Sequence, residues 1–127
     1  MNADANDMTA LAHRFLDAIE AGDVDALMHI YADDVAIWHN HDRLTVTRED
    51  SVATMRRFVA LAPTRRYMER QLDVFAGGFV GQHLLVAERA DGRRLELPAC
   101  LVCRVADGRI ARLNEFFDPA PITAWLA

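Results

Sequence analysis

Apolar residues recur at intervals of three and four along the first third of the chain, a pattern typical of helices that bury one face. The first stripe consists of Met8, Leu11, Ala12, Phe15, Leu16 and Ile19. Gly22 follows it, at the position where a left-handed C-cap is expected. Asp23 can then cap a second, shorter helix over residues 24–31. We therefore predict two consecutive helices.

A short strand over residues 35–40 and a third helix are predicted next. Thr47, with Asp50 three residues later, forms a capping-box-like start for this helix, and Pro63 marks its end. Between these limits the apolar residues again follow the helical period. They are Val52, Met55, Phe58, Val59 and Leu61. This helix should therefore also face a core.

Beyond Pro63 the apolar pattern changes to the two-residue period of strands. Three dipeptides divide this region at nearly equal intervals, and each favours a tight hairpin. They are Gly77-Gly78, Asp91-Gly92 and Asp107-Gly108. The predicted strands are 64–76, 79–90, 93–106 and 109–118, followed by a short helix or an apolar tail that docks. Helices first and an antiparallel meander afterwards predict an α+β domain, with the helices on one face of the sheet.

Length, composition and charge limit the number of domains and the classes of partner that this chain can have. The 127 residues suit one domain over 1–127, in which we expect residues 1–7 to form a disordered tail. All 14 basic residues are arginine and the net charge is -5, so lysine Schiff-base chemistry is excluded and no nucleic-acid partner is expected. The chain start lacks a signal-peptide pattern, and no apolar run approaches roughly 20 residues. A cytoplasmic location without a membrane partner is therefore expected.

Asp118 is the first candidate for chemistry, because it closes the last predicted strand directly before Pro119. Counting back by twos places Phe116 and Asn114 on the same strand face, the mixed surface of a pocket wall. Burial beside an aromatic ring would raise the pKa of the Asp118 carboxyl and make it a proton carrier near neutrality. Alternatively, Asp118 caps the next turn, as aspartate before proline often does.

His83 stands in the middle of an apolar strand, either as part of a pocket wall or as a histidine that is hydrogen-bonded in the core. Trp38 and Asn40 share one face of the short strand, where Asn40 can orient a ligand because its amide both donates and accepts. His39 and His41 alternate with them in the manner of a His-x-His metal pair. Their simpler interpretation is a pair of solvent-facing loop histidines.

The order of elements, with the stretches AIEAGDVDALMHIYADDVAIWHN and VADGRIARLNEFFD, resembles the nuclear transport factor two superfamily, also described as SnoaL-like or ketosteroid-isomerase-like. The resemblance spans nearly the whole chain. It implies a cone-shaped fold, in which a curved antiparallel sheet wraps around three N-terminal helices and encloses an apolar cavity. It also implies a homodimer formed through the outer face of the sheet.

Comparison within the superfamily separates several activities. Asn40 stands where ketosteroid isomerases carry their catalytic aspartate, and an amide cannot take that proton. Trp38, Asn40 and Asp118 resemble part of the limonene-epoxide hydrolase site. Those enzymes also need an arginine and an aspartate on a middle strand, where this chain has Gln82, His83 and Leu84. SnoaL-type cyclases place a general base where Asp118 stands, and His83 or Asn40 would donate a hydrogen bond to the developing oxyanion.

These observations predict a small enzyme that performs acid/base chemistry on a mainly apolar carbonyl or hydroxyl compound, without a cofactor or metal. Asp118 and His83 would be its catalytic residues. The predicted substrate-binding residues are Trp38, Asn40, Phe15, Met55, Phe58, Val59, Phe116 and Asn114. The alternative is a module of the same fold that binds a lipophilic ligand or assembles without turnover. A third possibility is a metal-binding protein that uses His39 and His41.

Overall fold

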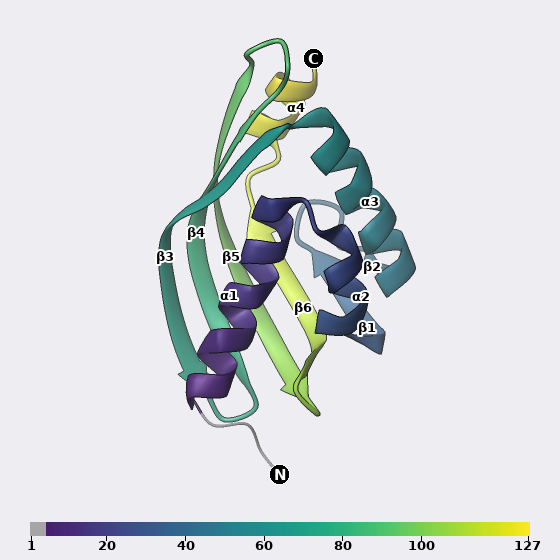
Figure 1. Cartoon of the computed structure of the whole chain (residues 1–127), viewed down its shortest axis with the longest axis vertical. Coiled ribbons are helices and arrows are strands. Elements are labelled where there is room, and N and C mark those ends of the chain that lie inside the picture. Colours follow the sequence, from purple (N-terminus) through teal and green to yellow (C-terminus); the bar gives the residue numbers. More distant parts are fainter. Residues whose placement is uncertain (1–4) are drawn as a thin grey trace.

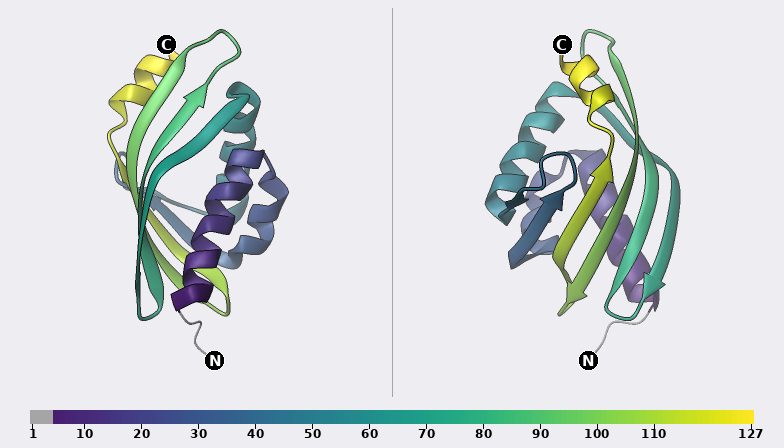
Figure 2. Two further views of the ribbon diagram at one scale, coloured as in Figure 1. Left: turned by 60° about the vertical axis from the view of Figure 1, so that its left-hand side comes forward. Right: turned by 180° about the vertical axis from the view of Figure 1, so that it is seen from behind.

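The computed structural model describes residues 5–127, which form a six-stranded curved sheet with helices on its concave side (Figure 1). The helices are α1 (Ala5–Ala21), the short 3-10 turn η1 (Val24–Ala26), α2 (Leu27–Ile30), α3 (Arg48–Leu61) and α4 (Ala120–Leu126). The strands are β1 (Tyr31–His39), β2 (Thr45–Val46), β3 (Thr64–Phe75), β4 (Gly78–Glu88), β5 (Arg94–Ala106) and β6 (Arg109–Phe117). Seen from behind, the convex face is not covered by α1, α2 or α3 (Figure 2).

The predicted helices are confirmed, with changes at their ends. Helix α1 stops at Gly22, whose φ of 76° is the left-handed conformation that glycine adopts easily. It begins at Ala5, so the expectation of a tail is wrong for residues 5–7, while residues 1–4 lie outside the described part. The Asp23 carboxylate caps η1 by accepting a hydrogen bond from the Ala26 amide, and Tyr31 already belongs to β1. The Thr47 hydroxyl accepts from the Asp50 amide at the start of α3, as predicted.

The sheet confirms the four-stranded meander and corrects the expectation that all strands are antiparallel. Its strand order is β2-β1-β6-β5-β4-β3, and β1 runs parallel to β6. No hairpin turn can join two parallel strands, so local turn signals carry no trace of this pairing. The two-residue strand β2 was not predicted either. The sheet is therefore mixed, curved and open.

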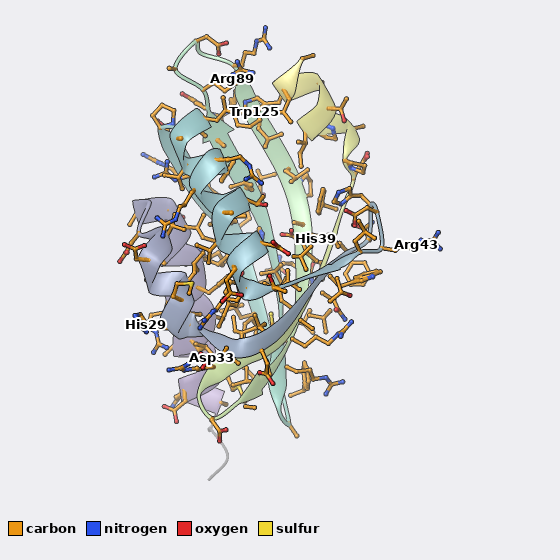
Figure 3. The ribbon with its side chains drawn as sticks, turned by 90° about the vertical axis from the view of Figure 1, so that its right-hand side faces the viewer. His29, Asp33, His39, Arg43, Arg89 and Trp125 are labelled. Atoms are coloured by element: carbon orange, nitrogen blue, oxygen red, sulfur yellow. The ribbon has the colours of Figure 1, made fainter. Side chains whose placement is uncertain are left out.

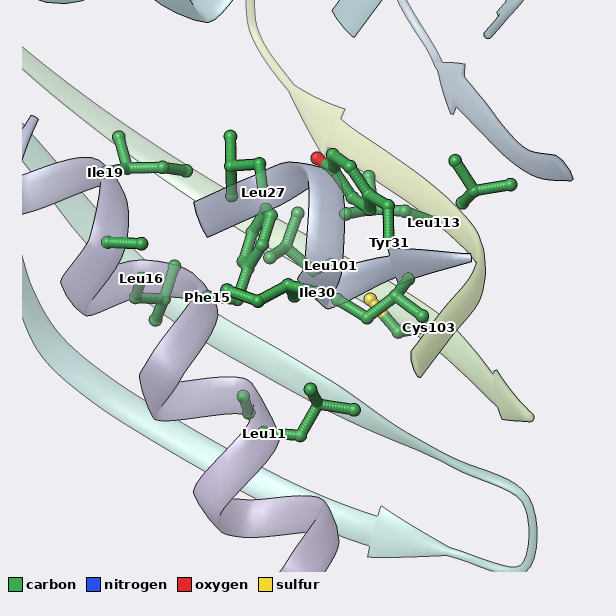
Figure 4. Close-up of a cluster of buried hydrophobic side chains, with 14 of the residues drawn as sticks. Leu11, Phe15, Leu16, Ile19, Leu27, Ile30, Tyr31, Leu101, Cys103 and Leu113 are labelled. Atoms are coloured by element: carbon green, nitrogen blue, oxygen red, sulfur yellow. The ribbon is translucent and has the colours of Figure 1, made fainter. Parts of the chain in front are cut away.

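The core fills the concave side of the sheet. The largest apolar side chains of α1 pack there against α2 and the inner faces of β5 and β6 (Figure 4). The residues labelled in this cluster are Leu11, Phe15, Leu16, Ile19, Leu27, Ile30, Tyr31, Leu101, Cys103 and Leu113. Arg65 fastens the end of α1 to β3, because its Nε and Nη2 donate to the carbonyls of Ile19 and Glu20 at 2.9 and 3.1 Å. In residues 5–127 no helix is long and apolar enough to cross a membrane.

The end of the chain docks as helix α4, which seals the upper end of the core. Trp125 is 5% exposed, its ring lies 6.2 Å from that of Phe58, and its indole N–H donates to the Arg93 carbonyl at 3.0 Å. Arg89 donates in turn to the Trp125 carbonyl at 2.9 Å. Side-chain and main-chain contacts of Trp125 thus both hold α4 in place.

We expect Trp125→Ala to lower the free energy of unfolding by about 3–5 kcal/mol, because it removes a large buried ring and leaves a cavity. Leu126→Ala is the matched control, since Leu126 is 54% exposed and its truncation should change stability by less than about 0.5 kcal/mol. Urea unfolding followed by circular dichroism measures both. Equal losses for the two variants would contradict the docking role of Trp125.

Candidate functional site

A cavity of about 30 Å³ lies between the helices and the concave face of the sheet. Aromatic and aliphatic side chains form most of its wall, and hydrogen-bonding groups interrupt them. The lining residues are Phe15, Leu16, Ile19, Tyr31, Ile37, His39, Ser51, Met55, Tyr67, His83, Leu101, Leu113 and Glu115. They come from α1, α3 and five of the strands, so only the folded chain brings them together.

His39 and Glu115 form an acid–imidazole pair at the rim of this cavity. They are directly opposite each other in the parallel β1–β6 ladder, and His39 Nε2 lies 3.3 Å from Glu115 Oε1. Their side chains are 25% and 27% exposed, so the pair has access to solvent. The hydrogen bond to Glu115 raises the pKa of His39, and it outweighs the opposite effect of burial. Figure 3 shows His39 within the molecule, whereas Arg43 on the next loop points outward.

His83 lies deeper in the cavity, on β4, and is 6% exposed. Neither ring nitrogen has a hydrogen-bond partner among the described residues. Its ring meets the ring of Tyr67 edge-on at a centroid distance of 4.8 Å. Desolvation lowers the pKa of His83, which favours the neutral imidazole, with one N–H donor and one acceptor nitrogen.

Two tyrosines supply further donors to the cavity. Burial raises the pKa of both Tyr31 and Tyr67 far above the ordinary value, and the negative charge of Glu115 adds to the shift. Hydrogen bonding with Ser51 opposes part of it for Tyr31. Both phenols therefore keep their protons across the physiological range and can act as O–H donors.

Three of the predicted site residues line the cavity: His83, Phe15 and Met55. Phe58 and Val59 pack against the same core but lie outside the cavity lining. Phe58 instead faces Trp125 of α4. The helical period correctly identified the inward face of α3, and only the tertiary packing decides which of its residues reach the open space.

The expectation that Asp118 lies in a pocket is wrong. Strand β6 ends at Phe117, and the Asp118 side chain is exposed, where its Oδ1 accepts a hydrogen bond from the Ala120 amide at 3.0 Å. Asp118 is thus the cap of the following turn, the alternative role stated for it above. The alternation over residues 114–118 was counted correctly, but the inward face of β6 is the one that carries the buried Leu113 and the cavity-lining Glu115. Asn114 and Phe116, which were counted with Asp118, lie on the opposite face.

The wrong face of the alternation was also chosen for other candidates. Trp38, Asn114 and Phe116 lie on the convex side, where the rings of Trp38 and Phe116 meet edge-on at 5.3 Å. Phe116 is 41% exposed. The Asn40 side-chain oxygen accepts from the Phe117 amide at 2.9 Å, so Asn40 fastens the end of β1 to β6 and does not line the cavity.

The pairing of His39 with Glu115 was not among the sites predicted from the sequence. The necessary signal was present, because the alternation from Ile37 to His39 and from Leu113 to Glu115 places both polar residues on the apolar face of their strands. His41, which the sequence also allowed as a metal ligand beside His39, has its Nε2 3.5 Å from Asp42 Oδ2. Within residues 5–127 no group of three or more candidate ligand side chains is placed to hold a metal ion.

Comparisons with known proteins agree with this fold. A family model described as a SnoaL-like domain matches residues 12–113. A structure of a candidate polyketide cyclase from Xanthomonas campestris has a TM-score of 0.83 at 18% identity, covering 98% of this chain and 100% of its own. A LEH-like epoxide hydrolase from M. tuberculosis has a TM-score of 0.78 at 17% identity, and the match covers 95% of this chain and 90% of the hydrolase chain. No match was found among proteins with curated functions. At these identities the structural similarity shows the fold alone.

The pair at the rim predicts a specific pH response. Because Glu115 raises the pKa of His39, the pair stabilises the fold fully below the unfolded-state value of about 6.5, and this contribution is lost as pH rises through the raised pKa. We expect Glu115→Gln to lower the pKa of His39, measured by an NMR titration of the imidazole. Exposed His29 serves as the internal control. An unchanged His39 titration would contradict the pairing.

Proposed function

The chain belongs to the SnoaL-like family, and from this premise we propose that it is a cofactor-free enzyme that transfers protons on an apolar carbonyl or hydroxyl compound. The observation that carries the proposal is the His39–Glu115 pair, which faces a cavity lined by hydrogen-bond donors. A carboxylate and an imidazole within one hydrogen bond can exchange a proton with each other and with a bound molecule.

In the proposed reaction Glu115 acts as the general base. Its carboxylate takes a proton from the carbon next to the substrate carbonyl. The electron pair of that C–H bond forms a carbon–carbon double bond, and the π electrons of the carbonyl move to its oxygen, which gives an enolate. His39 holds the carboxylate by its Nε2 and, when protonated, balances its charge. Return of the proton from Glu115 to the same carbon or to a conjugated one completes exchange or isomerisation.

The developing enolate oxygen requires donors that keep their protons. Tyr31 and Tyr67 meet this requirement because burial raises the pKa of each phenol. The neutral imidazole of His83 offers one further N–H in the same cavity. Fixed donors in a space with little water stabilise charge more than they would in solution, which is the basis of an oxyanion hole.

A homodimer through the convex face of the sheet is part of the proposal. Phe116 is 41% exposed there and packs against the edge of Trp38, which leaves an aromatic pair facing solvent. Burial of such a pair in a symmetric interface would be favourable.

Light scattering should give twice the mass of one chain for the wild type and a smaller mass for Phe116→Arg, because a charge would then face the partner. Leu44→Arg places the same change on a leucine that is 60% exposed in the loop before β2, and it should leave the mass unchanged. A monomeric wild type at the concentration tested would contradict the dimer.

Exchange of the α-protons of ketones in heavy water, followed by NMR over a panel from propanone to larger ketones, tests the chemistry. We expect Glu115→Gln to slow exchange by about 10²–10⁴-fold, because an amide cannot accept the proton. Asp118→Asn is the matched control and should leave the rate unchanged, since that carboxylate is an exposed cap. Equal rates for wild type and Glu115→Gln would overturn the proposal, and binding without exchange would favour the non-catalytic ligand-binding module.

A further inference from the structure

The cavity is small for a ligand site. Pockets that hold drug-sized molecules usually enclose about 300–1,000 Å³, whereas this one encloses about 30 Å³. One water molecule needs about 10–15 Å³ of such space, so the cavity has room for about two waters. A polycyclic substrate could enter only if the core around α1 and α3 moved apart.

One polar side chain in this small space, His83, remains open to a ligand. His83 is 6% exposed, lines the cavity and has two ring nitrogens without a partner among the described residues. A buried polar group in a native protein is normally paired, because an unpaired one loses its hydrogen bonds to water without replacement. A small occupant with an oxygen atom would satisfy His83, since a carbonyl accepts from its N–H and a hydroxyl also donates to its other nitrogen.

The charges in the cavity favour an uncharged occupant. Glu115 already has a cationic partner when His39 is protonated, at 3.3 Å. A carboxylate on the ligand would lie near the negative charge of Glu115. The residues that line the cavity include no arginine that could pair with this second anion. The free-energy cost of removing a charged ligand from water into this mainly apolar space would not be offset by an ion pair.

We propose that the cavity takes a neutral carbonyl or hydroxyl compound of only a few non-hydrogen atoms, with its oxygen hydrogen-bonded to His83 and with Met55 setting the size limit. This inference rests on the proposed function for the placement of the reacting carbon toward Glu115. It adds a substrate class and two residues with separate tasks, one for anchoring and one for size selection.

Met55 is the residue whose truncation would enlarge the cavity at least cost to the fold. It reaches the cavity from α3, is only partly buried, and has the flexible unbranched side chain that fills irregular gaps. Phe15 also lines the cavity, but it is 5% exposed and packs on Tyr31 at a centroid distance of 5.7 Å. Shortening Phe15 would therefore disturb the core itself.

The test compares propanone with cyclohexanone as probes, by titrating each into protein with isotope-labelled histidine nitrogens. We expect propanone to shift the His83 ring nitrogens in a saturable way, and cyclohexanone to bind about tenfold more weakly or worse. Met55→Ala should remove most of this difference by admitting the larger ketone. Equal or tighter binding of cyclohexanone to the wild type would overturn the size limit.

A second pair of variants tests the anchor. His83→Phe keeps a ring beside Tyr67 and removes both nitrogens, so we expect about a tenfold loss of propanone affinity. His29→Gln changes an exposed histidine outside the cavity and should have no effect. Propanone binding that leaves the His83 resonances unmoved, or no binding at all, would overturn the proposal even if His83→Phe failed to fold.

These measurements need no turnover, which separates them from the test of the proposed function. If ketone exchange survives in Glu115→Gln while the size series behaves as expected, the catalytic assignment fails and the small-ligand site stands. If Glu115→Gln abolishes exchange but cyclohexanone binds the wild type as well as propanone, the catalytic assignment stands and the size limit fails.

Discussion

The parallel pairing of β1 with β6 is the constraint on which the candidate site depends. It sets His39 opposite Glu115 in one ladder, 3.3 Å apart, although 76 positions of sequence separate them. The Asn40 side chain extends this pairing by one more hydrogen bond, to the Phe117 amide. Because the hydrogen bonds of a ladder fix the register, the pair is held by backbone structure and not by flexible loops.

The cavity follows from how helices pack on a curved sheet. The large residues of α1 cover the middle of the concave face, and Arg65 ties the end of that helix to β3 through two main-chain carbonyls. Helix α4 closes the upper end through Trp125. What remains between α1, α3 and the sheet is a small space whose wall is largely rigid core, and Met55 is its adaptable part.

The polar groups of this space are more costly to the fold than apolar ones would be. Burial shifts the pKa of Tyr31, Tyr67 and His83 in the direction that favours the uncharged form of each, and the His83 ring nitrogens have no partner among the described residues. Glu115 and His39 keep access to solvent, and each is the charge-bearing partner of the other. The interior therefore separates neutral hydrogen-bonding groups from one pair able to exchange protons, which is the division of tasks that acid/base chemistry requires.

The sequence by itself determined most of the secondary structure. Capping residues such as Thr47 and the glycine-containing turns placed three helices and the four-stranded meander, because those signals act within a few residues of chain. Which strand face became the interior was decided by the tertiary structure. Packing of the helices made the face of Leu113 and Glu115 the interior, and not the face that pointed to Asp118. A parallel partner distant in sequence brought Glu115 to His39. Such features arise from long-range hydrogen bonding and packing, which a local pattern of apolar and polar residues does not encode.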